Sequence, residues 1–180
     1  MLSFSLIRTF IPLCIGVCLG ASATVANAYS VSVSAPGSIT YSAIQTSASN
    51  QTTYIHGTQF SVTDTRGATV GYYATISSSN LTSGSKTIGR ENLALYVTGA
   101  TVSTLSGSAN ASVVVPTGAG AIGSQYVSLS SATTLISRTN AGGGLYGTYG
   151  VSPAFRLTIP AYTPSGSYSA TLTITLIENE

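Results

Sequence analysis

Apolar residues alternate with hydroxylated ones along most of residues 29–180, with the two-residue period typical of half-buried β-strands. The pattern is clearest in residues 168–176, where the large apolar residues at even positions share one face of an extended strand. It also predicts strands at residues 31–33, 60–62, 72–76, 93–97 and 126–129. No stretch combines an apolar period of three to four with good helix formers, so almost no helix is expected.

Turn-forming residues separate these strands. They occur at residues 35–37, 65–67, 83–85, 116–118 and 163–166, each with Gly, Pro or both. Residues 43–53 are small and polar and residues 140–149 are rich in glycine, so both are predicted to be long loops. Short strands at this spacing indicate a two-sheet sandwich or a small barrel. We expect an all-β fold, an antiparallel β-sandwich of immunoglobulin-like or Greek-key style, forming one domain over residues 29–180.

The first 28 residues have a different pattern. Arg8 precedes an apolar run over residues 10–19, and small residues follow up to Ala28, which is the order found in a secretory signal peptide. Cleavage after Ala28 and a secreted, extracellular protein at the cell surface are therefore expected. The apolar run is too short to span a bilayer, because a membrane helix needs about 20 apolar residues, and no membrane span is expected in the mature chain. Cys14 and Cys18 lie in this segment, without the small preceding residue usual at lipid-modified cysteines, so the mature chain has no cysteine.

Charge is scarce along the chain. Charged residues make up 6% of the sequence, against about 25% in ordinary globular proteins. Residues 29–180 hold five cations and four anions, a net charge of +1, so the basic stripe of a nucleic-acid binder is missing and no nucleic-acid partner is expected. So little charge also removes the repulsion that keeps molecules apart, which permits self-association.

The residues available for catalysis are few. His56 is the only histidine, and no Gly-x-Ser-x-Gly turn accompanies it, so we interpret it as an ordinary surface or loop residue. Asp64 and Glu91 are the acids a glycosidase pair would need, yet nothing favours that pair over salt bridges with Arg66 or Arg90. With four acids, one histidine and no mature cysteine, we expect no metal, no cofactor and no enzymatic activity.

Tyrosine is the most prominent residue with binding chemistry, since the chain has 11 tyrosines and no tryptophan. A tyrosine ring can stack on a sugar while its hydroxyl forms a hydrogen bond. Tyr146, Tyr149 and Tyr162 lie in or beside segments rich in Gly or Pro, where such contacts are accessible. The alternative is that each ring packs across strands of the sandwich.

Two stretches resemble the WxL family of bacterial surface domains. Residues 62–84 contain an Asp-x-Arg-Gly turn at Asp64, an aromatic strand and a Leu-Thr-Ser-Gly exit, in the order that this family shows around its first Trp-x-Leu motif. Residues 157–176 resemble the family's closing hairpin and second motif. The tryptophans are replaced: Tyr72 with Ala74 stands at the first motif, and Ile174 with Leu176 at the second.

This resemblance implies a β-domain that attaches non-covalently to the peptidoglycan of the bacterial cell wall. The expected function is a non-catalytic binding or scaffold module whose partners are the cell wall or other surface proteins. Tyr72 and Tyr73 are the first candidate binding residues, because they occupy the place of the first motif, and Tyr146 and Tyr149 are the second. The closing pattern also resembles fimbrial β-domains, so the alternative is a structural subunit of a fimbria or surface layer that assembles through strand edges.

Overall fold

The computed structural model describes residues 29–56, 58–67, 70–96, 102–108, 114–115, 126–139 and 146–178. Four of the regions discussed above lie outside this part of the chain: the expected signal peptide at 1–28, the expected turn at 116–118, Val97 at the end of a predicted strand, and residues 140–145 of a predicted loop.

The first strands are β1 (Val31–Ser34), β2 (Gln51–Ile55), β3 (Phe60–Asp64), β4 (Tyr72–Ser78), β5 (Leu81–Ser83), β6 (Lys86–Ile88) and β7 (Leu93–Tyr96). The others are β8 (Val102–Gly107), β9 (Val114–Val115), β10 (Val127–Ser128), β11 (Thr133–Arg138), β12 (Gly147–Val151), β13 (Ala154–Ile159) and β14 (Leu172–Glu178).

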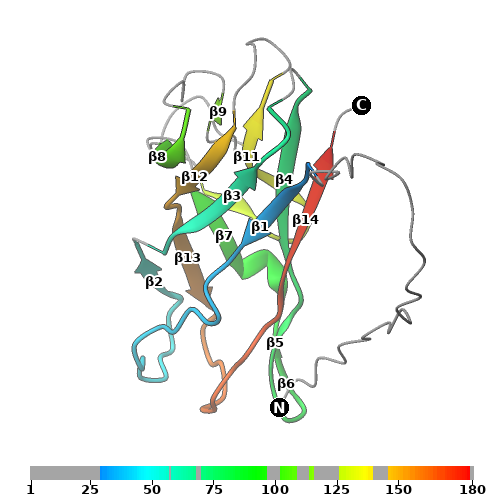
Figure 1. The fold of residues 1–180 in the computed structure, drawn as a ribbon. Coiled ribbons are helices and arrows are strands. Elements are labelled where there is room, and N and C mark those ends of the chain that lie inside the picture. Colours follow the sequence, from blue (N-terminus) through cyan, green and yellow to red (C-terminus); the bar gives the residue numbers. More distant parts are fainter. Residues whose placement is uncertain are drawn as a thin grey trace, which may run out of the picture.

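All the strand pairs in the described residues are antiparallel, and they form three four-stranded sheets and one hairpin (Figure 1). The sheet orders are β1-β3-β12-β8, β10-β7-β13-β2 and β14-β4-β11-β9. A single 3-10 turn, η1 (Arg90–Asn92), precedes β7 in the described chain. The prediction of an all-β, sandwich-like fold with almost no helix is therefore confirmed.

Two of the sheets follow one another along the same stretches of chain. Strand β2 leads into β3, and β12 leads into β13, so the pair β3–β12 continues as the pair β2–β13. The ladder is interrupted at Ser152 and Pro153, between β12 and β13. Proline has no backbone N–H to donate to a ladder, which explains why one long strand is divided here.

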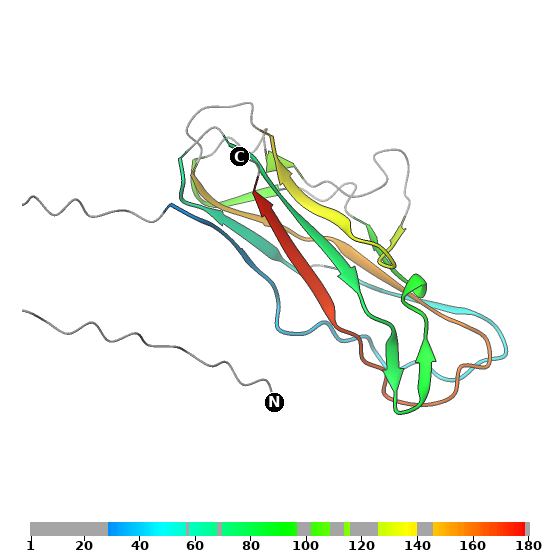
Figure 2. The same ribbon diagram turned by 90° about the vertical axis from the view of Figure 1, so that its right-hand side faces the viewer.

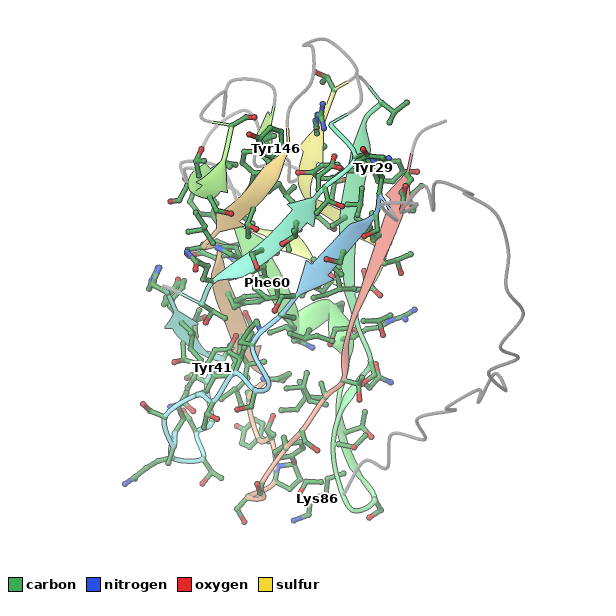
Figure 3. All side chains as sticks on the ribbon, in the orientation of Figure 1. Tyr29, Tyr41, Phe60, Lys86 and Tyr146 are labelled. Atoms are coloured by element: carbon green, nitrogen blue, oxygen red, sulfur yellow. The ribbon has the colours of Figure 1, made fainter. Side chains whose placement is uncertain are left out.

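The third sheet packs its inner face against the other two. Strand β4 shows the expected alternation, with Tyr72, Ala74 and Ile76 buried and the residues between them partly exposed. Phe60 on β3 meets Phe155 on β13 with 6.0 Å between ring centroids, and Figure 3 shows Phe60 in the middle of the molecule. The largest buried apolar side chains of this shared core are Tyr72, Tyr149, Phe60, Phe155, Ile76, Leu95, Leu129, Leu135, Ile136 and Val62.

The hairpin β5–β6 extends from one end of the molecule (Figure 2). Its turn is one of those predicted from the sequence, and Gly84 takes φ +61° there, a conformation that residues with a Cβ seldom adopt. Predicted strands at 31–33, 60–62 and 72–76 lie within β1, β3 and β4. In the closing segment the strand begins only at Leu172, although Ser169 forms an isolated bridge with Thr82.

Both predicted long loops need correction. Gln51, Thr52 and Thr53, assigned to the first loop, open strand β2, and residues 147–149 of the second open strand β12. Small and polar residues form strands at these places because their backbones pair with neighbouring strands. Strand β12 has a partner on each side, and the edge strand β2 has one partner. Strand β12, for example, lies between β3 and β8, and its Gly150 is buried where a Cβ would come within 3.0 Å of Gln59 and 3.3 Å of Leu105. Tertiary pairing has here overridden weak local propensity.

Candidate binding surface

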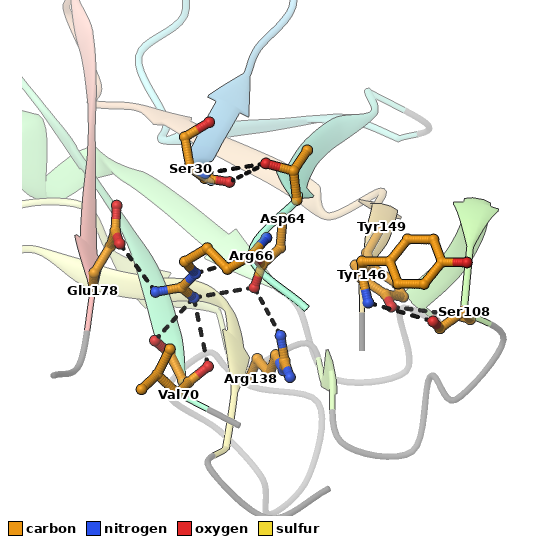
Figure 4. Close-up of polar contacts among 11 residues, drawn as sticks. Ser30, Asp64, Arg66, Val70, Ser108, Arg138, Tyr146, Tyr149 and Glu178 are labelled. Carbon is orange, nitrogen blue, oxygen red and sulfur yellow. Dashed lines mark hydrogen bonds and ion pairs between the residues drawn. The ribbon is translucent and has the colours of Figure 1, made fainter. Parts of the chain in front are cut away.

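A buried ionic cluster lies between the layers at the end of β3, formed by Asp64, Arg66 and Arg138 (Figure 4). Arg138 Nη1 donates to Asp64 Oδ2 at 2.7 Å, and both side chains have 0% exposure. Arg66 donates from Nε to Oδ1 and from Nη2 to Oδ2, both at 3.0 Å. Burial alone would raise the pKa of the Asp64 carboxyl, but the hydrogen bonds and charges of the two arginines outweigh it and hold that pKa below its usual range.

Arg66 also connects the end of β3 to the other sheet. Its Nη1 donates to Glu178 Oε2 on β14 at 3.0 Å, and its Nη2 approaches the carbonyl oxygens of Val70 and Gly71 at 3.5 and 3.3 Å. The sequence left Asp64 open between a catalytic pair and a salt bridge, and the structure places it in salt bridges. The cluster therefore holds the two layers together.

Two of the four candidate tyrosines are part of the interior. Tyr72 and Tyr149 each have 0% exposure, so neither ring can stack on a ligand in this structure. Tyr149 donates its hydroxyl to the carbonyl oxygen of Ser108 at 3.1 Å, and burial, followed by the charge of Asp64, raises the pKa of Tyr72. The strand period explains the outcome for Tyr72, since alternate residues of β4 face the core. We therefore correct the assignment of these two rings to an accessible binding surface.

The other two candidates lie on the surface but apart from each other. Tyr73 follows Tyr72 on β4 and is half-buried on the opposite, outer face, between Ser137 of β11 and Ile177 of β14. Tyr146 stands just before β12 with 57% exposure, and its backbone N–H donates to Ser108 Oγ at 3.3 Å. No ring contact joins the four candidates among the described residues. They do not form one site.

The residues considered for catalysis are also separated. His56 is exposed after β2, and its ring stacks on Tyr54 with centroids 6.3 Å apart and an angle of 18° between planes. Glu91 lies in η1, where its carboxylate accepts a 3.4 Å hydrogen bond from Asn92. The oxygens of Asp64 are occupied by Arg66 and Arg138, so the described interactions join Asp64 to neither His56 nor Glu91.

A different group of aromatic residues gathers on the outer face of the sheet β10-β7-β13-β2. Tyr126 is its central ring, with centroids 5.6 Å from Tyr54 and 5.2 Å from Tyr96. The guanidinium carbon of Arg156 lies 4.7 Å from the centre of the Tyr126 ring. We call Tyr54, Tyr96 and Tyr126, together with His56 and Arg156, the tyrosine cluster.

Strand register explains why these side chains meet. Phe155 of β13 is buried in the core, so the next residue, Arg156, faces outward. Tyr54 of β2 is the direct partner of Arg156, and Ala94 of β7 is its partner on the other side. Ala94 is small and has 2% exposure, which leaves room above it for larger neighbours.

Tyr96 reaches the cluster from the inner strand β7, and Tyr126 from the residue before the edge strand β10. Tyr96 lies two residues after Ala94 and so faces the same way. Tyr126 comes immediately before Val127, which pairs with Leu95, so the Tyr126 ring lies beside Tyr96. The cluster thus collects side chains from β2, β7, β13 and the residue before β10.

The environment of the rings combines apolar contact with a cation. Partial burial raises the pKa of Tyr126, the neighbouring phenols of Tyr54 and Tyr96 add to this effect, and Arg156 opposes it. Tyr126 therefore keeps its hydroxyl proton over the ordinary pH range and can donate a hydrogen bond. Tyr54 is 50% exposed, so the face is open to a ligand.

Sequence reasoning missed this cluster. Its three tyrosines lie far apart in the chain, and only Tyr126 follows a segment rich in glycine, residues 118–123. Alternation within residues 93–97 does place Tyr96 on the face opposite Leu95. Nothing in the sequence, however, says that β7 pairs with β13 or that β13 pairs with β2, and those pairings create the cluster.

Other sources of functional information are few. In the part of the chain that the structure describes, no three His, Cys, Asp or Glu side chains come together in a way that could hold a metal ion. Among the same residues, no helix is long and apolar enough to cross a membrane. No family model matches the sequence, and a search of curated proteins finds no significant match.

Proposed function

We propose that this protein is a non-catalytic module of the bacterial cell surface that associates non-covalently with the glycan of the cell wall, and that the tyrosine cluster is its contact surface. The observation that carries the proposal is the packing of Tyr54, Tyr96 and Arg156 around the Tyr126 ring on an outer sheet face. Tyrosine rings present an apolar face to the C–H groups of a sugar and a hydroxyl to its oxygens. A sheet holds such rings in fixed positions, which lowers the entropy lost on binding.

Three sequence features support the same proposal. The first 28 residues have the order of a secretory signal, which would bring the protein to the wall. The low charge suits a molecule held at a surface rather than one kept apart in solution. The resemblance of residues 62–84 and 157–176 to WxL domains points to wall attachment, although in this chain the proposed contact moves from Tyr72 to the tyrosine cluster.

Co-sedimentation with purified peptidoglycan tests the proposal. We expect the purified protein to pellet only when wall is present, and Tyr54→Ala to reduce the pelleted fraction several-fold because it removes the most exposed tyrosine of the cluster. Tyr146→Ala is the matched control, since Tyr146 is similarly exposed, at 57% against 50% for Tyr54, but lies outside the cluster. Wild-type protein that stays in the supernatant with wall at all salt concentrations would overturn the proposal, and equal loss in both variants would remove the cluster from it.

A second candidate function is a structural subunit of a fimbria or surface layer, and it is favoured by the edge strand β14. Within the described chain β14 pairs only with β4, through seven consecutive residue pairs without a bulge. It contains no proline and no lysine, two of the devices that usually protect sheet edges. Leu172, Ile174 and Leu176 on its inner face are only partly buried.

The hydrogen-bonding pattern between β4 and β14 shows which backbone groups of β14 remain free to pair with another strand. Ser79 N donates to Thr171 O at 3.0 Å, and donor positions alternate along an antiparallel pair. The backbone groups of Leu172, Ile174 and Leu176 therefore point away from β4, toward a possible added strand.

Sedimentation velocity at high protein concentration tests this second function. If the protein assembles through β14, the wild type should form species larger than the monomer. Thr175→Lys should convert these species to monomer, because Thr175 is exposed on this strand. Thr87→Lys, at an exposed position of the hairpin strand β6, is the control. A single monomer peak for the wild type would exclude assembly through this edge under those conditions.

A further inference from the structure

Arg156 differs from the other partly or fully buried arginines in what surrounds its guanidinium. Arg66 and Arg138 both donate to the Asp64 carboxylate. In the described part of the chain, Arg156 has no carboxylate within salt-bridge distance and donates no side-chain hydrogen bond, and its Nε is buried without an acceptor. A guanidinium carries five N–H donors, and buried donors in folded proteins are nearly always satisfied.

The Tyr126 ring contacts this guanidinium without a hydrogen bond between the two side chains. The guanidinium carbon lies 4.7 Å from the ring centre, which is the separation of a cation–π contact. The N–H groups of its two Nη atoms have no hydrogen-bond partner in the described chain and remain available for a planar, two-oxygen acceptor such as a carboxylate. The stacked ring also restricts the side chain, so less entropy is lost when an anion binds.

The surroundings of Arg156 match a sugar better than an isolated anion. Tyr54, at 50% exposure, stands directly opposite Arg156 across the β2–β13 pair, and Tyr96 contacts Tyr126 on the other side. A saccharide lying on these rings brings its substituents to the level of the guanidinium. A carboxylate on the sugar would then supply the acceptor that the protein lacks.

We propose that the tyrosine cluster selects saccharides that carry a carboxylate, with Arg156 as the anion-binding residue and the tyrosines as the stacking surface. This inference rests on the proposed function, because it names the class of ligand for the same site. A neutral sugar of the same shape contacts the rings but leaves the donors of Arg156 without an acceptor, so it binds more weakly.

Oligogalacturonate and its fully methyl-esterified form provide a matched pair of probes, since esterification removes the charge and keeps the sugar rings. Binding is followed by tyrosine fluorescence, which no tryptophan obscures in this chain. We expect the acid to bind about tenfold or more tightly than the ester, as for a charge-assisted hydrogen-bonded pair. Added salt should weaken binding of the acid and leave binding of the ester nearly unchanged.

Variants separate the two roles in the cluster. Arg156→Gln should bring the ratio of acid to ester affinity close to one, whereas Tyr54→Ala should weaken both ligands and keep the ratio. Arg156→Lys keeps the charge but loses the planar pair of donors, and it should give an intermediate ratio. This second variant, together with the salt dependence of the wild type, keeps the test decisive where Arg156→Gln does not fold.

The outcomes distinguish the inference from the proposed function. Wild-type protein that pellets with wall but binds the ester as tightly as the acid, or binds neither probe, overturns the carboxylate selection and leaves wall association standing. An acid preference that survives Arg156→Gln removes Arg156 from the role. Wild-type protein that fails to bind the wall and both saccharides overturns the two proposals together.

Discussion

Arg138 and Arg156 are arginines in antiparallel strands of one domain, yet they lie in opposite environments. Arg138 is on β11 with 0% side-chain exposure and meets the Asp64 carboxylate at 2.7 Å. Arg156 is on β13, partly exposed beneath the ring of Tyr126, and has no carboxylate within ion-pair distance among the described residues. The charge of Arg138 is therefore compensated by a carboxylate within the fold, whereas the guanidinium of Arg156 can still interact with a ligand.

The difference teaches where function can be sought in a chain with so few charges. A fully buried charge needs an opposite charge within the fold, because its desolvation costs several kcal/mol in real proteins. The Asp64 carboxylate accepts hydrogen bonds from both Arg66 and Arg138, so these three charges contribute to the stability of the fold. Arg156 needs no such compensation to fold, and its unused donors make it a candidate for recognition.

The largest expected effect comes from breaking the buried pair. Arg138→Met leaves Asp64 with Arg66 alone and should reduce the free energy of unfolding by about 3–5 kcal/mol. Arg156→Met is the matched variant and should cost about 1 kcal/mol or less, since it removes a cation–π contact without leaving a buried charge alone. For a chain of this size the melting temperatures should differ by roughly 6–15 °C.

Urea unfolding of the two variants measures this contrast directly. Equal losses of stability would contradict the comparison, because they would mean that Arg156 is as much a part of the folded framework as Arg138. The double variant Asp64→Leu with Arg138→Met should recover part of the loss, since it removes both buried charges of the pair.

Acid should weaken the fold through the same cluster. The pKa of Asp64 is lower in the folded protein than in the unfolded chain, where an aspartate titrates near about 3.9. Its contribution to stability is therefore fully present above about pH 4–5 and is lost as the pH falls through the folded pKa. The melting temperature of the wild type should drop more steeply below pH 4 than that of Asp64→Asn. Parallel pH profiles would show that Asp64 does not supply the acid sensitivity.

The two buried tyrosines should respond differently to loss of the hydroxyl. Tyr149→Phe removes the 3.1 Å hydrogen bond to Ser108 O and should cost about 1 kcal/mol. The Tyr72 hydroxyl is buried without a partner in the described structure, so Tyr72→Phe should be neutral or slightly stabilising. Thermal unfolding of the two variants checks the order, and a larger loss for Tyr72→Phe would contradict it.

The smallest effect is expected at the exposed end of the ionic cluster. Glu178 bonds Arg66 at 3.0 Å, but its side chain is 47% exposed, so solvent screens the pair. Glu178→Gln should cost less than about 1 kcal/mol, and 1 M salt should reduce that difference further. A cost approaching that of Arg138→Met would mean that this link between β3 and β14 is much stronger than its exposure indicates.

The sequence was sufficient for properties that depend on near neighbours. Alternating side chains predicted the all-β fold and the strands containing Val62 and Tyr72, because the strand period acts within a few residues. It failed for β2 and β12, whose small and polar residues form strands only through their partners. It also placed Tyr72 and Tyr149 at a binding surface, since alternation says that two faces exist but not which one meets the other sheet.

By itself, then, the sequence determined the class of fold, the low charge and the scarcity of catalytic groups. Only the tertiary structure decided which arginine meets Asp64 and which lies under Tyr126. The physical reason is that hydrogen-bonded strand pairing joins residues many positions apart, as it joins Arg156 to Tyr54 across β2 and β13. Local pattern carries no information on that register, and the tyrosine cluster exists only because of it.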